Sequence, residues 1–118
     1  MEKIKLQIPN KTKYSQSLRL LISSFCDIAG FDCEELVDIM VCVSEFMLIS
    51  KKICEKYINL EIELEEGAIS LKLSSCVDID LEKELSDEDK MSIMVLKSLM
   101  DEVIVNKDNI IIKKSAGN

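Results

Sequence analysis

The feature that most constrains this chain is a mostly apolar segment in its first half. Between residues 39 and 49 the only charged side chain is Glu45. The apolar residues Ile39, Val43 and Met47 repeat at the spacing of a helix. A helix that is apolar nearly all round must be covered on several sides, so we expect it at the centre of the domain. A buried carboxylate is costly without a partner, so Glu45 either reaches the domain edge and pairs with a lysine, or takes part in chemistry.

Hydrophobic periodicity divides the rest of the chain into strands and helices. Alternation of apolar and polar residues predicts strands, and Asp32 followed by Glu35 predicts a capping box at the start of the central helix. The acidic stretch at residues 78–89 has few apolar residues and is expected to be a loop, within which Ser86 can cap a further helix. The expected elements, in order, are a strand at residues 3–8, a helix ending at Gly30, a helix from residue 32 to about residue 55, strands at residues 58–64 and 69–73, a helix after Ser86, and strands at residues 103–105 and 110–112.

This order, βααββαββ, predicts a two-layer α+β sandwich within the broad α/β class. We expect a mixed, mostly antiparallel sheet of about five strands with three helices on one face. The chain has 118 residues, which is enough for one hydrophobic core. A single domain over residues 1–118 is therefore expected.

Composition excludes several kinds of partner. The formal net charge of −7 argues against nucleic acid, which needs a basic face, and favours a basic protein partner. The N-terminal residues carry charges where a signal peptide would be apolar, and no segment is long enough to span a membrane, so we expect a cytoplasmic protein. The five cysteines form no C-x-x-C pair and there is no histidine. We therefore expect no metal site, and cysteines that act as small apolar residues in a reducing cell.

Several short segments, together with the order of the elements, resemble the anti-sigma factor serine kinases. The segments IPNKTKYSQSLRLLISSF, EELVDIMVCVSE and LMDEVIVNKD resemble the family's first strand and helix, its second helix, and its entry to the final hairpin. The resemblance covers nearly the whole chain. It implies the GHKL (Bergerat) fold, also called the histidine kinase-like ATPase fold, and a role in partner switching that regulates bacterial transcription in stress or sporulation.

The family's second helix carries the motif Glu-x-x-x-Asn, in which the glutamate is the general base and the asparagine holds magnesium. The resemblance places Glu45 at the position of the base. Ile49 occupies the position of the asparagine and cannot coordinate a hard cation. Glu45 is thus expected to be a vestigial catalytic residue.

The family's two glycine motifs are also replaced. The adenine-binding Asp-x-Gly aligns with Ser75 and Val77, and the phosphate-binding Gly-x-Gly aligns with Met91 and Ile93. The replacements for the asparagine and the glycines are all apolar, which predicts that the nucleotide pocket has become hydrophobic core. No cofactor is therefore expected.

We expect a catalytically inactive, anti-sigma-factor-like protein that acts by binding another protein. In the family an arginine on the first helix contacts the partner, and the resemblance places Arg19 there. The partner would be a sigma factor, an anti-anti-sigma protein or a related subunit. The resemblance also implies a homodimer through the first strand and the first helix.

Two alternatives stay open. The chain could be an active ATP-dependent serine kinase with a divergent nucleotide site, in which Asp78, Asp80 and Glu45 serve the metal and the adenine. It could also have refitted the former pocket for a small apolar ligand.

Overall fold

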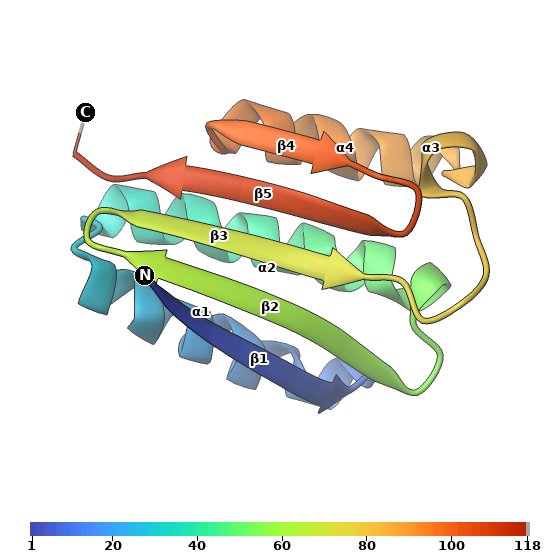
Figure 1. The fold of residues 1–118 in the computed structure, drawn as a ribbon, viewed down its shortest axis with the longest axis horizontal. Helices are drawn as coiled ribbons and strands as arrows, with labels where there is room; N and C mark the ends of the chain where they lie inside the picture. Colours follow the sequence, from blue (N-terminus) through green and yellow to red (C-terminus); the bar gives the residue numbers. More distant parts are fainter. Residues whose placement is uncertain (118) are drawn as a thin grey trace.

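The computed structural model describes residues 1–117 and places a sheet against a layer of helices (Figure 1). The α+β class is confirmed. None of the helices in this described part is both long and apolar enough to cross a membrane. The elements are β1 (Glu2–Pro9), the 3₁₀ turn η1 (Thr12–Tyr14), α1 (Ser15–Ala29), α2 (Cys33–Ile53), β2 (Tyr57–Glu65), β3 (Ala68–Ser74), α3 (Leu81–Glu84), α4 (Asp87–Leu99), β4 (Glu102–Val105) and β5 (Asn109–Ser115).

The five strands lie in the order β1-β2-β3-β5-β4, and every neighbouring pair is antiparallel. The expectation of a mixed sheet is therefore wrong, although the strand number is confirmed. The reason lies in the last hairpin. Strand β4 runs in the same direction as β3, but β5 lies between them and opposes both.

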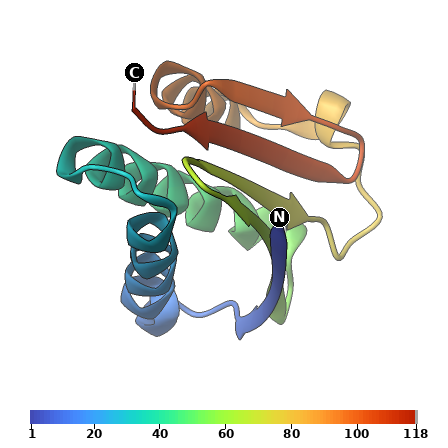
Figure 2. The same ribbon diagram turned by 60° about the vertical axis from the view of Figure 1, so that its left-hand side comes forward.

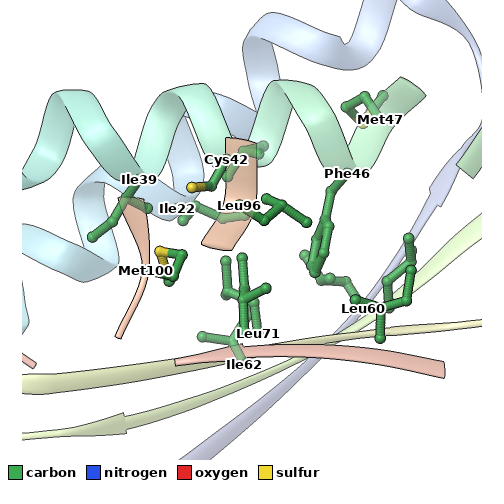
Figure 3. Packing of buried hydrophobic residues seen from close by; sticks show 14 of the residues in the cluster. Ile22, Ile39, Cys42, Phe46, Met47, Leu60, Ile62, Leu71, Leu96 and Met100 are labelled. Atoms are coloured by element: carbon green, nitrogen blue, oxygen red, sulfur yellow. The ribbon is translucent and has the colours of Figure 1, made fainter. Parts of the chain in front are cut away.

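The core lies between the sheet and the long helices α1, α2 and α4, which all cover one face of the sheet (Figures 1 and 2). Helix α2 packs against α1 on one side and against α4 on the other. Ile39 and Phe46 of α2 point toward the sheet, with Phe46 next to Leu60 and with Ile62 and Leu71 between the two (Figure 3). Each such side chain, fully buried, contributes about 1.5–3 kcal/mol through removal of apolar surface from water.

The opposite face of the sheet carries a network of charged side chains. Glu61 on β2 pairs with Lys5 on β1 at 3.6 Å and with Lys72 on β3 at 3.3 Å. The hydrogen bond from Lys72, helped by the neighbouring lysine charges, holds the pKa of Glu61 below its usual range. This contribution to stability is present at neutral pH and is lost when acid protonates Glu61. The charged network keeps this face of the sheet polar.

Local capping signals set the ends of the helices. The predicted capping box is present: the Glu35 N–H donates to Asp32 Oδ1 at 2.8 Å, and the Asp32 N–H donates to Glu35 Oε1 at 2.9 Å. At the start of α4 the Asp89 N–H donates to the Ser86 hydroxyl at 3.2 Å, so Ser86 is also a cap. Both helix starts were therefore predicted from the sequence.

The acidic stretch contains an element that the sequence pattern did not predict. The expected loop includes the short helix α3, which is capped by Asp80 and fixed by the fully buried Leu81. One turn of helix is too short to show a helical repeat, so the prediction of a loop throughout was wrong.

Gly30 ends α1 in a left-handed conformation, with φ of 92°, and its N–H donates to Asp27 O. A Cβ at this position would meet no atom within 4 Å. Gly30→Ala should therefore lose stability through the backbone conformation alone, by about 1–2 kcal/mol. Urea unfolding measures this change. Ser24→Ala, on the exposed face of the same helix, is the control and should stay within about 0.5 kcal/mol of the wild type.

Candidate functional site

Two of the apolar residues that the resemblance aligns with the family's nucleotide motifs lie in the core. Ile49 on α2 has no exposed surface, and Ile93 on α4 is 7% exposed. Both belong to the single cluster of buried residues between the helices and the sheet. At these two positions, apolar side chains contribute to packing.

Met91 does not lie in the core. Its side chain is 67% exposed, and the expectation that it fills the pocket is wrong. Capping at Ser86 sets the rotation of α4 so that Asp89, Ile93 and Leu96 face inward, which turns Met91 toward solvent. The remaining pair, Ser75 and Val77, are half-buried in a turn after β3, where the Ser75 hydroxyl donates to Val77 O at 2.9 Å.

Glu45 is half-buried on α2. Within residues 1–117 its carboxylate makes no ion pair or hydrogen bond, so the expected pairing with a lysine is wrong. Lys52, two turns further along the same side of α2, pairs instead with Asp89 at 3.2 Å. The carboxylate that the sequence singled out is thus left without a partner.

Arg19 is half-buried and links α1 to α2. Its Nη2 donates to Gln16 Oε1 at 2.9 Å, and its Nη1 donates to Ser44 Oγ at 3.3 Å. The Ser44 hydroxyl in turn donates to Met40 O at 3.1 Å. These bonds use two of the five guanidinium donors, so the side chain is fixed while other donors stay available for a ligand.

Arg19 lies in a cleft of about 420 Å³ between the start of α1 and the C-terminal half of α2. We call this hollow the Arg19 cleft. It holds a second cation, Lys51, and one carboxylate, Glu55, and the half-exposed Leu48 forms part of its apolar wall. The arrangement can hold an anionic group next to an apolar one.

Asn10 fixes one wall of the Arg19 cleft. It follows Pro9, the last residue of β1, and its side-chain amide donates to Ser50 O at 3.1 Å and to Cys54 O at 2.7 Å. Ser50 O also accepts the N–H of Cys54 at 2.9 Å, and Cys54 is the residue that caps the C-terminal end of α2. One side chain therefore anchors the end of β1 to the end of α2.

A separate hollow of about 510 Å³ lies over α3, α4 and β4. Its lining includes Leu81, Ile93 and the exposed Met94, with Lys90 and Lys97 beside them. Ile93 lies one turn along α4 from Asp89, whose carboxylate pairs with Lys52 of α2 at 3.2 Å.

The cysteines divide into two groups. Cys26, Cys42 and Cys54 are buried, and burial raises the pKa of each to about 12. Cys33 and Cys76 are exposed, so the expectation that the cysteines act as small apolar core residues is wrong for these two.

A scan against models of known protein families finds no match to this chain, and a search of curated protein sequences also finds none. The resemblance to the anti-sigma factor kinases therefore rests on the residues quoted above.

Asn10→Ala should weaken the anchor between β1 and α2. It removes both side-chain hydrogen bonds, to Cys54 O and to Ser50 O, of which Ser50 O keeps the Cys54 N–H as a donor, and it is expected to lower the free energy of unfolding by about 1–3 kcal/mol. Urea unfolding of the purified variant measures the loss. Lys11→Ala changes the neighbouring exposed residue and should have almost no effect. Equal stability of the two variants would contradict the anchoring role of Asn10.

Proposed function

We propose that this protein is a catalytically inactive relative of the anti-sigma factor kinases, with a GHKL-like fold, that acts by binding another protein in the bacterial cytoplasm. The partner is a sigma factor, an anti-anti-sigma protein or a related subunit. The observation that carries the proposal is the Arg19 cleft, which joins a fixed guanidinium group to exposed apolar surface.

The surface around Arg19 has the composition of a protein-binding site. Leu20 is 56% exposed on α1, and Leu48 is 50% exposed on α2. Arginine beside apolar side chains is typical of the residues that dominate binding at protein interfaces. A carboxylate of the partner can accept two hydrogen bonds from the guanidinium group, and a neighbouring apolar side chain can cover Leu48.

The packing of Ile49 supports the absence of catalysis. In the family that this chain resembles, the corresponding asparagine holds magnesium. Here the side chain has no oxygen or nitrogen and is completely buried. Without a magnesium ligand at this position, no metal would be held to activate a phosphoryl group for Glu45 to act on as a base.

Strand β1 supports a homodimer as part of the same proposal. It lies at one edge of the sheet, and within residues 1–117 its strand partner is β2 alone, which leaves the other side of its backbone available. Antiparallel pairing of two copies of β1 would bury both edges around a two-fold axis.

Arg19→Ala tests the proposed binding surface. The variant should keep nearly the wild-type melting temperature, because the lost hydrogen bonds are only half-buried, while affinity for the partner falls at least about tenfold. Calorimetry with purified sigma factors and anti-anti-sigma proteins from the same cell measures the affinity.

Glu45→Ala is the control, because Glu45 does not line the Arg19 cleft. It should bind the partner as the wild type does. Equal binding by wild type and Arg19→Ala would remove this surface from the proposal, and failure of every candidate partner to bind would remove the proposal itself.

An active kinase with a divergent nucleotide site is the second candidate. The exposed position of Met91 favours it, because this side chain does not fill the space that phosphate would need. Asp78 and Asp80 would then supply carboxylates near the adenine and the metal.

Thermal unfolding with millimolar ATP and magnesium separates the two candidates. A ligand at one hundred times its dissociation constant stabilises a protein by about 2.7 kcal/mol, which raises the melting temperature by several degrees. We expect no rise, because Ile49 and Ile93 are apolar and packed in the core. A rise of several degrees that is lost in Glu45→Gln would favour the kinase.

A further inference from the structure

The structure brings together two cysteines that are distant in the sequence. Cys54 caps the C-terminal end of α2, and Cys76 lies two residues after the end of β3. The Cys76 N–H donates to Ile53 O at 2.8 Å, which places the backbones of the two segments side by side. The Cys54 thiol also donates to the carbonyl oxygen of Ser74, the last residue of β3, at 3.6 Å.

The two thiols have different environments. Cys54 is 2% exposed, whereas Cys76 is exposed to solvent. Burial, and after it the adjacent Cys76 thiol, raise the pKa of Cys54 to about 12. The side-chain amide of Asn59 donates to Cys76 Sγ at 2.9 Å, and the Cys76 thiol donates to Tyr57 O at 3.7 Å, so both bonds fix the position of this sulfur beside β2.

We propose that Cys54 and Cys76 are an oxidation site that forms a reversible intramolecular disulfide, with a peroxide as the oxidant. Cys76 is the thiol that the peroxide reaches, and Cys54 is the resolving thiol behind it. Cys76 belongs neither to the charge network of the sheet nor to the lining of the Arg19 cleft, whereas Cys54 lines that cleft, so the disulfide would form directly behind one of its walls.

The reaction proceeds in two balanced steps. The Cys76 sulfur attacks one oxygen of hydrogen peroxide as its thiol loses its proton, the O–O bond breaks, and the leaving hydroxide takes up that proton, so the products are a sulfenic acid on Cys76 and a water molecule. Cys54 sulfur then attacks Cys76 sulfur, the S–O bond breaks, and the leaving hydroxide takes the Cys54 proton to form a second water. Overall, two thiols are oxidised to one disulfide, and one peroxide is reduced to two water molecules. A small-molecule dithiol reverses the reaction.

A disulfide between these two cysteines would restrict the motion of the segments that they belong to. A Cys54–Cys76 bond would tie the last turn of α2 to the turn that holds Ser75 and Val77. It would also cross-link the chain between residues 54 and 76, which restricts the unfolded state.

Treatment of the purified full chain with hydrogen peroxide, followed by tryptic mass spectrometry, tests the proposal. We expect a cross-link between the peptides that contain Cys54 and Cys76, and a rise in melting temperature of about 10 °C that dithiothreitol reverses. Cys76→Ser should show neither the cross-link nor the rise. Cys33→Ser removes the other exposed thiol and should show both, as the wild type does.

Three results would overturn the proposal. One is a disulfide that joins Cys33 residues of two chains in place of the internal bond. Another is conversion of Cys76 to its sulfinic acid without a cross-link. The third is a reversible rise in melting temperature that survives in Cys76→Ser. Because Cys76 is exposed, its substitution by serine is compatible with the fold.

Discussion

The structure depends on the packing of α2 between three neighbours. The sheet lies beneath this helix, α1 lies on one side and α4 on the other. Such a position requires apolar residues around most of the helix, which is the pattern seen between residues 39 and 49. Two polar residues of α2 connect it to its neighbours. Ser44 accepts a hydrogen bond from Arg19 of α1, and Lys52 forms an ion pair with Asp89 of α4. The same helix therefore positions both the core and the Arg19 cleft.

Features that depend on neighbouring residues could be predicted, and features that depend on distant contacts could not. The capping boxes at Asp32 and Ser86 each lie within a few residues, so the sequence contains the whole signal. Hydrophobic periodicity predicts which segments are strands but not which strands pair, so it could not predict that β5 lies between β3 and β4. For the site, the resemblance singled out Arg19 on the first helix, but its bond to Ser44 and the Asn10 anchor join segments far apart in sequence, which local patterns do not predict.

The two sides of α2 have different consequences for function. Ile49 lies in the core, and within residues 1–117 the Glu45 carboxylate makes no ion pair. On the side of α1, Arg19 and Leu48 form an organised surface that is open to solvent. Under the proposed function, the domain has kept its scaffold and its binding surface while its catalytic side has become structural.

Both ends of the described chain lie at the same end of the molecule, away from the Arg19 cleft (Figure 1). Glu2 pairs with Leu64 near the β2–β3 turn, and the Ala116 N–H donates to Gly67 O in that turn. The Asn10 anchor lies at the opposite end of β1, next to Lys56. A fluorescent reporter or an immobilisation tag can therefore be attached at either end with the cleft facing outward, so surface-based assays can present this face to a partner in a defined orientation.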